Sequence, residues 1–363
     1  MSAPRFYELK VKDVRVETSD CVSVALVVPD EQWDIFRFAP GQYLTFRKHI
    51  DGAEIRRSYS ICVSPKEKEL RVAIKKVEGG KFSGYANEAL KKGDILDVMP
   101  PMGKFSPKAS EKTQRNYLFI AAGSGITPIM SIMKAVLEDE PKSNISLIYG
   151  NRSKSSIIFR EEIEGLKNKY MQRLSVFHIL SREQMDAELF NGRISAEKCA
   201  EFCKRGLIDV AHTDEAFICG PEDMILSVRE KLAELGMPLA NIHIELFSSP
   251  DQPNVKHEKW AKEHERDASK VSRVSITLDG NTFEMDLAYN GDSILDAALK
   301  HGADLPYACK GGVCCTCRAR VMEGKVDMEV NYALEKDEVE KGFVLTCQSH
   351  PRTERVVIDF DER

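Results

Sequence analysis

The sequence lacks any long hydrophobic run and carries little net charge. No stretch approaches the roughly 18 uninterrupted apolar residues that a membrane-spanning helix needs. The opening segment MSAPRFYELKVKD has no apolar core of the kind found in a signal peptide. The net charge of −5 offers no source for the counterion release that drives binding to nucleic acid. We therefore predict a cytoplasmic protein with neither a membrane nor a nucleic acid as partner.

Cysteine, by contrast, is abundant. The chain has 10 cysteines, and five of them lie between residues 309 and 347. Disulfides are rare in the cytosol, so a cysteine cluster in a cytosolic protein indicates metal or redox chemistry. This segment is the first candidate for a functional site.

The length and the strand pattern of the chain predict several domains. At 363 residues the chain can form two or three domains of roughly 150 residues each. In the amino-terminal part, turn signals separate six short runs that are typical of an antiparallel β-barrel or sandwich, and we expect the barrel. The runs are FYELKVKDVRVE, VSVALVV, GQYLTFR, RRSYSI, LRVAIKKV and DILDVMP.

From Tyr117 to Phe247, apolar strands alternate with helical periodicity, which predicts a parallel sheet with crossover helices. Residues 248–272 are rich in charge and predict a solvated linker with one helical turn around Trp260. Beyond the linker, VSITLDGNTFEMDL predicts a hairpin, and a short helix is expected from Ser293 to Lys300.

Four cysteines have the spacing of a plant-type [2Fe–2S] cluster. Cys309, Cys314 and Cys317 give the pattern C-x4-C-x2-C, and Cys347 follows further along the chain. Three thiolates on one loop require that loop to wrap the cluster tightly. The Gly-Gly pair at residues 311–312 can supply positive φ and allow backbone amides to approach the cluster.

Zinc is the competing interpretation of this segment. Cys314, Cys317, Cys347 and His350 could form a Cys3His site. That site would leave Cys309 and the glycine pair without a role. In the cluster interpretation Cys315 is the surplus cysteine, and we expect it to face away from the metal as a small hydrophobic residue.

A flavin site is indicated by the tetrapeptide Arg57-Ser58-Tyr59-Ser60. On a strand, Arg57 and Tyr59 share one face, so the guanidinium can bind a pyrophosphate and the ring can pack on an isoalloxazine. Ser60 places a hydroxyl near the flavin edge. A short amphipathic strand without a ligand would have the same pattern. The later segment Gly79-Gly80-Lys81-Phe82-Ser83 favours the flavin, because Ser83 can cap a helix whose amino terminus faces phosphate.

A nucleotide site is indicated after the strand YLFIAA. Gly123-Ser124-Gly125-Ile126-Thr127-Pro128 predicts a tight turn into a helix, with Thr127 as its cap and Pro128 at its first position. Such a helix start suits a pyrophosphate. The third glycine of a Rossmann motif is missing, and a glycine turn without a ligand is the alternative.

The second and third strands of this sheet end in Asn151-Arg152 and Ser181-Arg182. An NAD site usually ends its second strand with an acidic residue that holds the ribose hydroxyls, which is absent here. Two arginines and a serine suit a 2′-phosphate, so NADPH is favoured over NADH. The next strand ends in Cys219-Gly220-Pro221, and from these residues alone the cysteine is more often a buried small residue at a strand end.

Together these motifs resemble the ferredoxin–NADP reductase superfamily with a C-terminal plant-type [2Fe–2S] ferredoxin domain. The resemblance covers R-x-Y-S, the later G-x-x-S, G-x-G-x-T-P, C-G-P-x-x-M and a closing E-x-aromatic that ends in Phe247. It implies a place for Cys219 beside the nicotinamide and a place for Phe247 near the flavin. It also implies FAD contacts from Arg57, Tyr59, Ser60, Ile74, Lys75, Lys81, Phe82 and Ser83.

Within that superfamily, the segments YGNR, EAFICGP and LPYACKGGVC resemble the reductase subunits of ring 1,2-phenylacetyl-CoA epoxidases. The resemblance implies electron transfer from NADPH through FAD and [2Fe–2S] to an oxygenase component, expected to be a diiron protein. Another diiron or Rieske oxygenase, another acceptor, or a zinc-stabilised binding module without catalysis are the alternatives. The expected domains are a flavin-binding β-barrel (1–108), an α/β nucleotide-binding domain (109–247), the linker (248–272) and a β-grasp ferredoxin domain (273–363).

Overall fold

The computed structural model describes residues 5–107, 113–247, 260 and 270–362. By packing, the chain divides into two compact units. One unit contains the first two β-sheets except residues Arg56–Ser58, and these residues are assigned to the other unit, which contains the third sheet with the cysteine-rich loop.

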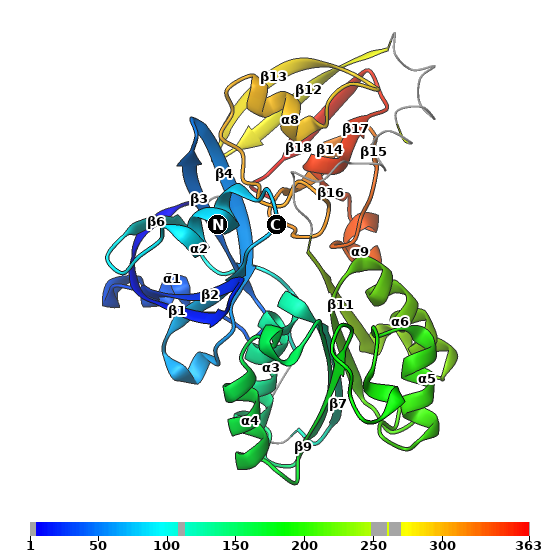
Figure 1. The fold of residues 1–363 in the computed structure, drawn as a ribbon. Coiled ribbons are helices and arrows are strands. Elements are labelled where there is room, and N and C mark those ends of the chain that lie inside the picture. Colours follow the sequence, from blue (N-terminus) through cyan, green and yellow to red (C-terminus); the bar gives the residue numbers. More distant parts are fainter. Residues whose placement is uncertain (1–4, 108–112, 248–259, 261–269, 363) are drawn as a thin grey trace. The chain divides into compact units, whose positions relative to one another are not determined.

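The first sheet contains six antiparallel strands, and each run predicted for the amino-terminal part forms one of them (Figure 1). Leu9 and Val11 of β1 are buried and Lys10 between them is exposed, as a strand with one solvated face requires. The strand order is β4-β3-β6-β1-β2-β5, and a bridge from Ile61 to Val72 joins the outer strands. The predicted barrel is confirmed. Its elements are β1 (Tyr7–Thr18), β2 (Cys21–Val27), α1 (Trp33–Phe36), β3 (Tyr43–Ile50), β4 (Ala53–Ser60), β5 (Leu70–Lys75), α2 (Lys81–Glu88) and β6 (Ile95–Val98).

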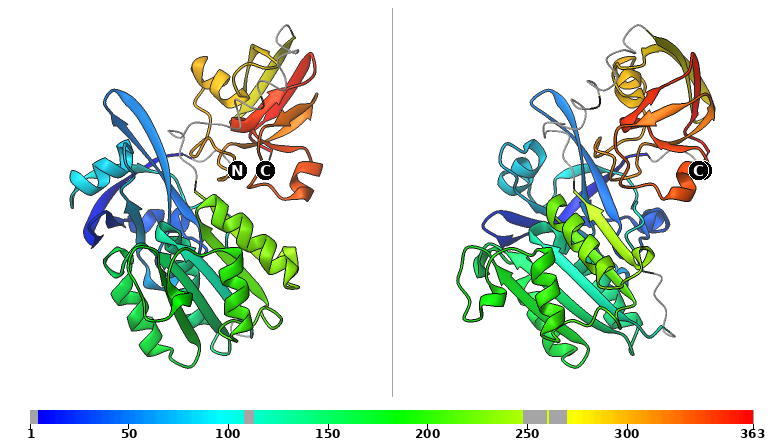
Figure 2. Two further views of the ribbon diagram at one scale, coloured as in Figure 1. Left: turned by 45° about the vertical axis from the view of Figure 1, so that its right-hand side comes forward. Right: turned by 90° about the vertical axis from the view of Figure 1, so that its right-hand side faces the viewer.

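The second sheet has five parallel strands in the order β11-β10-β7-β8-β9, as predicted. Helices α3 and α4 cover one face and α5 and α6 cover the other (Figures 1 and 2). The loops that follow β7, β8, β9 and β10 therefore meet at the carboxyl edge of the sheet. The elements are β7 (Asn116–Ala122), α3 (Ile126–Asp139), β8 (Asn144–Asn151), α4 (Arg160–Lys169), β9 (Leu174–Leu180), α5 (Ala196–Lys204), β10 (Glu215–Gly220), α6 (Glu222–Glu234) and β11 (Ile242–Leu246).

Helix α3 is buried along most of its length. Every residue from Ile126 to Leu137 is buried, because the helix packs against the parallel sheet on one side and the barrel on the other. Cys62 and Phe105 of the barrel belong to the same apolar cluster as Ile129 and Met133. This continuous burial explains why the helix is apolar around its whole circumference.

The third sheet is mixed, with the order β13-β12-β18-β14-β16 and helix α8 packed on it, as expected for a β-grasp domain. The predicted hairpin forms β12 and β13, and Ser293 caps α8 by accepting a hydrogen bond from the Asp296 amide. A separate pair, β15 and β17, lies near the cysteine-rich loop. The elements are β12 (Val271–Leu278), β13 (Asn281–Ala288), α8 (Ile294–Lys300), β14 (Arg318–Glu323), β15 (Val326–Met328), α9 (Lys336–Glu340), β16 (Phe343–Leu345), β17 (Ser349–Pro351) and β18 (Arg355–Asp359).

Both predicted domain junctions fall mainly on residues outside the described part. Residues 108–112 separate β6 from β7, and residues 248–259 and 261–269 separate β11 from β12. Trp260, between those ranges, is helical as predicted, but it is not solvated. It is 8% exposed, and its ring stacks on the His350 imidazole with 3.9 Å between centroids. None of the described helices is long and apolar enough to cross a membrane.

Candidate functional site

The nucleotide motif forms a tight turn between β7 and α3. Gly123 has a φ of +54°, and a Cβ on Gly125 would lie 2.2 Å from the carbonyl oxygen of Cys219. Only glycine allows the turn to lie this close to the end of β10. The Tyr149 hydroxyl donates a hydrogen bond of 3.0 Å to the Gly123 carbonyl, which helps to hold the turn in place.

The start of α3 differs from the prediction. The helix begins at Ile126, so Thr127 and Pro128 lie inside its first turn, and the predicted Thr127 cap is wrong. The reason is that residues 123–125 form a 3-10 turn that continues directly into the helix. Thr127 donates its hydroxyl to the Ser124 carbonyl instead. No side chain caps this helix start, and the Ile126 amide donates to the carbonyls of Gly123 and Ser124 within the turn. The positive end of the helix dipole at this start suits an anion.

The turn forms one wall of a cavity of about 480 Å³ at the carboxyl edge of the parallel sheet. Lys75 of β5 also lines the cavity, so the cavity reaches from the nucleotide sheet to the barrel. Gly125, Thr127 and Cys219 are buried behind this wall and do not line it. Besides Lys75, the predicted residues that line it are Gly123, Ser124, Arg152, Ser181, Arg182, Gly220, Pro221 and Phe247.

Three arginines line this one cavity. Arg152 and Arg182 follow β8 and β9 as predicted, and Arg193 joins them because Asn191 bridges back to Leu180 at the end of β9. In the described part of the chain, none of the three guanidinium groups forms an ion pair with a carboxylate. They are therefore available to an anionic group of a ligand.

The sequence reasoning missed Arg193 and also Asp223. Asp223 lies in the first turn of α6 and contributes a carboxylate to the cavity wall. The motif Cys219-Gly220-Pro221 could have predicted Asp223, because residues directly after that motif lie at the same edge of the sheet. Arg193 had no comparable signal, because its position depends on the bridge between Asn191 and Leu180.

The flavin motif lies on β4 beside an aromatic cluster. The Tyr59 ring lies 6.0 Å from the Phe46 ring and 5.7 Å from the Phe82 ring, measured between centroids. Phe82 and Ile74 are at most 1% exposed and pack into the barrel core, whereas Tyr59 is only partly buried. Of these side chains, only Tyr59 has exposed surface on which the planar ring of a ligand could pack.

Helix α2 begins at Lys81 with Gly80 before it, so the predicted start at Ser83 is wrong. Ser83 is the third residue of the helix and accepts a hydrogen bond of 3.1 Å from the Val77 amide. Its hydroxyl therefore holds the preceding loop rather than capping the helix. As at α3, no side chain caps the helix start, and a phosphate can approach its amides.

Ser60 links the barrel to the nucleotide sheet. Its hydroxyl donates a hydrogen bond of 3.1 Å to a carboxylate oxygen of Glu245 on β11. Burial raises the pKa of Glu245 to about 8, and the bond from Ser60 offsets only part of this effect. Glu245 therefore carries a proton at neutral pH. Burial likewise raises the pKa of the Cys219 thiol, which stays neutral.

The four predicted cluster cysteines come together in the third-sheet unit. Cys309, Cys314, Cys317 and Cys347 are each at most 7% exposed. Their thiols contact one another in pairs, 314 with 309 and 347 with 317. These contacts, together with burial, raise the pKa of Cys314 and that of Cys347 well above the ordinary value. Metal that supplies positive charge would favour the thiolate forms of Cys314 and Cys347.

The cysteine loop takes its shape from several residues. Gly312 has a φ of +74°, as predicted, but Gly311 does not have positive φ, and Lys310 and Cys315 adopt that conformation instead. The Gly311 amide donates to the Cys309 sulfur at 3.3 Å. The Cys315 thiol donates to the Ala333 carbonyl at 3.2 Å, which agrees with its predicted orientation away from the four ligands.

The geometry does not support the zinc interpretation. His350 Nε2 lies 2.6 Å from Glu329 Oε1, and its ring is covered by Trp260. Within the described ranges, no group of three or more histidine, cysteine, aspartate or glutamate side chains is arranged to hold a single metal ion. Two pairs of thiols instead suit a cluster with two iron atoms, each held by two cysteines.

Comparison with known proteins agrees with this arrangement. Models of three families match the chain: an oxidoreductase FAD-binding domain at residues 8–106, an oxidoreductase NAD-binding domain at residues 119–230, and a 2Fe-2S iron-sulfur cluster binding domain at residues 276–352. The 2Fe-2S match excludes the zinc-stabilised binding module.

Full-length relatives share all three parts. One subunit of the 1,2-phenylacetyl-CoA epoxidase from Escherichia coli (strain K12) is 46% identical, with 99% of this chain and 98% of the relative covered. The ferredoxin reductase component of 3-ketosteroid-9-alpha-monooxygenase from Rhodococcus rhodochrous is 34% identical, with 97% and 96% covered. The solved structure of phthalate dioxygenase reductase has the same fold, with a TM-score of 0.59 at 20% identity over 98% of both chains.

The fold and the site define an NAD(P)H-dependent flavin oxidoreductase that passes electrons to a [2Fe–2S] cluster. The chain belongs to the ferredoxin–NADP reductase-like family in which an FAD-binding domain, an NAD-binding domain and a C-terminal [2Fe–2S] domain follow one another.

Proposed function

We propose that this protein is the cytoplasmic reductase component of a phenylacetyl-CoA epoxidase and that it prefers NADPH. The acceptor would be a diiron oxygenase component. The proposed acceptor is supported by the 46% identity to the epoxidase protein of Escherichia coli, compared with 34% identity to the 3-ketosteroid monooxygenase reductase. The three arginines of the cavity support the choice of nucleotide.

In the proposed nucleotide site, the turn at Gly123-Ser124-Gly125 and the uncapped start of α3 bind the pyrophosphate. Arg152, Ser181 and Arg182 bind the 2′-phosphate, with Arg193 as a third cation. Thr127 positions the turn through its bond to Ser124. Gly220 and Pro221 form the wall beside the nicotinamide.

In the proposed flavin site, Arg57 and Lys81 bind the FAD pyrophosphate and Tyr59 packs on the isoalloxazine. Lys75 and the exposed ring of Phe247 line the passage between the two sites. Ile74, Phe82 and Ser83 hold the backbone that surrounds the flavin. When bound, FAD accepts a hydride and releases electrons singly, which links a two-electron donor to a one-electron cluster.

The proposed catalytic residues are Ser60 and Cys219. Ser60 presents its hydroxyl at the flavin edge, and its bond to Glu245 keeps that hydroxyl in one orientation. The neutral thiol of Cys219 and the close contact between its carbonyl and Gly125 fix the end of β10, where the nicotinamide is expected. In this proposal Ser60 orients the flavin edge and Cys219 orients the nicotinamide. Because both side chains are neutral, neither places a negative charge near the transferred hydride.

The proposed cluster ligands are Cys309, Cys314, Cys317 and Cys347. The segment from residue 273 onward contains 17 acidic and 11 basic residues, so it carries an excess charge of −6. An acidic surface suits docking onto a basic patch of the oxygenase component.

Reconstitution with the oxygenase component of a phenylacetyl-CoA epoxidase tests the proposal. We expect oxidation of NADPH that depends on phenylacetyl-CoA and is coupled to formation of its epoxide. The oxygenase component of a 3-ketosteroid monooxygenase is the matched control, and it should support much slower turnover. Equal rates with both oxygenases, or coupling only with the second, would contradict the proposed acceptor.

A further inference from the structure

One loop of the barrel is attached to helix α3 by a set of polar contacts. The loop runs from residue 61 to residue 69 and links β4, which carries Tyr59 and Ser60, to β5, which carries Lys75. Helix α3 begins at the nucleotide turn. This contact therefore joins the strands of the proposed flavin site directly to the helix of the proposed nucleotide site.

Hydrogen bonds tie the two elements at buried positions. Ser131 of α3 donates to the Val63 carbonyl at 2.6 Å, and Ser64 donates to Glu138 of α3 at 2.6 Å. Ser64 and Ser131 are fully buried. A buried hydroxyl that loses its hydrogen-bond partner raises the free energy of the folded protein. The contacts therefore favour one relative position of helix and loop.

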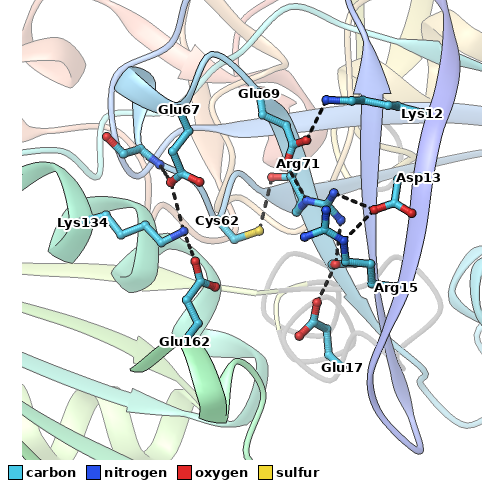
Figure 3. A network of polar contacts seen from close by, with 12 residues as sticks. Lys12, Asp13, Arg15, Glu17, Cys62, Glu67, Glu69, Arg71, Lys134 and Glu162 are labelled. Carbon is cyan, nitrogen blue, oxygen red and sulfur yellow. Dashed lines mark hydrogen bonds and ion pairs between the residues drawn. The ribbon is translucent and has the colours of Figure 1, made fainter. Parts of the chain in front are cut away.

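Lys134 is the charged centre of this contact. Among residues 126–137, all of them described and buried, it is the only charged one. Its ammonium donates to Glu67 of the loop at 3.0 Å and also pairs with Glu162 of α4 (Figure 3). Burial alone would lower the pKa of Lys134, but attraction and hydrogen bonds to Glu162 and Glu67 raise it. The side chain stays charged at neutral pH.

The two carboxylates differ in what they connect. Glu162 belongs to the nucleotide domain, as Lys134 does, whereas Glu67 belongs to the barrel. The Glu67 oxygen that accepts from Lys134 also accepts from the Ser64 amide at 2.7 Å, so the ion pair and the loop conformation depend on the same atom. The other buried cation in Figure 3, Arg71, pairs with Asp13 and Glu69 of the barrel alone.

We propose that Lys134 and Glu67 are positioning residues for hydride transfer, because their ion pair fixes the nucleotide helix on the flavin barrel. The proposal concerns the transfer from nucleotide to FAD and does not depend on the identity of the oxygenase. A displacement of about 1 Å between reacting groups can cost roughly a hundredfold in rate. A modest shift of α3 on the barrel should therefore slow the transfer without removing the binding groups of the cavity.

Glu67→Gln and Glu162→Gln form a matched pair of variants. Each removes one carboxylate charge from the same ammonium, and the two carboxylate side chains are similarly exposed, at 36% and 43%. Both variants leave Lys134 with one carboxylate partner, so neither buries an unpaired charge. Glutamine at position 67 also keeps an oxygen that can accept from the Ser64 amide.

The test is anaerobic stopped-flow reduction of the holoprotein by the nucleotide that the wild type prefers. For Glu67→Gln we expect the rate constant at saturating nucleotide to fall about tenfold, with half-saturation changed by less than about twofold. For Glu162→Gln we expect a rate constant within about twofold of the wild type. Equal rate constants in both variants and the wild type, with similar losses of melting temperature, would show a structural role only and overturn the proposal.

Hydrogen exchange of the nucleotide-free protein provides a readout that does not depend on turnover. In Glu67→Gln, exchange should accelerate in both segments 61–69 and 126–139, because the contact between them opens more often. In Glu162→Gln, segment 61–69 should keep the wild-type exchange rate. Unchanged exchange in both segments of Glu67→Gln would overturn the proposal even if the rate constant fell.

Discussion

The proposed preference for NADPH rests on the arginines of the cavity and can be tested by removing two of them. Arg152 and Arg182 end neighbouring parallel strands and face the same cavity. In the double variant Arg152→Ala/Arg182→Ala, the 2′-phosphate of NADPH loses its main cationic partners. NADH lacks that phosphate, so its binding should change little.

The magnitude follows from the strength of charge-assisted hydrogen bonds. Each is worth roughly 1.5–3 kcal/mol, and the lower end applies here because both side chains are exposed to solvent. Two such bonds give about 3 kcal/mol, and about 1.4 kcal/mol corresponds to a tenfold change. We therefore expect kcat/KM for NADPH to fall about a hundredfold and kcat/KM for NADH to change less than about threefold.

The assay is steady-state reduction of a soluble dye with each nucleotide, for the double variant and two controls. Arg205→Ala removes an exposed arginine that pairs with Glu201 on α5, outside the cavity, and should leave both values unchanged. Lysines at positions 152 and 182 should keep part of the preference, since charge remains while the planar fork is lost. An equal fall for both nucleotides, or no fall, would refute the assignment of these arginines to the 2′-phosphate.

Three further predictions concern the cluster, the buried carboxyl and the partner. Cys309→Ser should lose the visible spectrum of the cluster while flavin reduction by nucleotide persists, and Cys315→Ser should keep both; loss of the cluster in Cys315→Ser alone would refute the ligand assignment. In the folded protein the pKa of Glu245 is about 8, above its ordinary value of 4.5. The stability that the protonated side chain contributes to the fold is therefore complete below pH 4.5 and is lost as pH rises through 8. The melting temperature of the wild type should therefore fall relative to that of Glu245→Gln between these pH values, and parallel curves would contradict this pKa. Electron delivery to the oxygenase should slow as salt rises above physiological strength, where the Debye length is about 8 Å, and flavin reduction alone should respond less. Equal salt responses of the two reactions would argue against docking through the acidic surface of residues 273–363.

Local sequence patterns predicted the features that depend on short segments. The six barrel strands follow short runs of strand-forming residues separated by turn signals, and the spacing of Cys309, Cys314 and Cys317 predicts the loop that gathers them. The helix starts were less accurate. Thr127 and Ser83 are good cap residues, but each helix begins earlier. Before Thr127, the glycine turn at 123–125 continues into the helix as a 3-10 turn. Before Ser83, the extended Gly80 precedes the helix and Lys81 is its first residue.

Contacts between distant segments could not be predicted in this way. Ser60 meets Glu245 only because β4 and β11 approach each other across the junction of barrel and nucleotide sheet. Arg193 reaches the cavity only through the bridge between Asn191 and Leu180. Such positions depend on how whole sheets pack, and no local propensity encodes that packing.

Anaerobic reduction of the purified protein by NADPH tests the central claim of a relay from nucleotide through FAD to [2Fe–2S]. Chemical analysis should first find about one FAD, two irons and two acid-labile sulfides per chain. Stopped-flow absorbance should then show bleaching of the flavin followed by bleaching of the cluster, and a rapidly frozen sample should give the electron paramagnetic resonance signal of a reduced cluster. Bound zinc without sulfide, or a cluster that only a chemical reductant reduces while NADPH bleaches the flavin alone, would contradict the account.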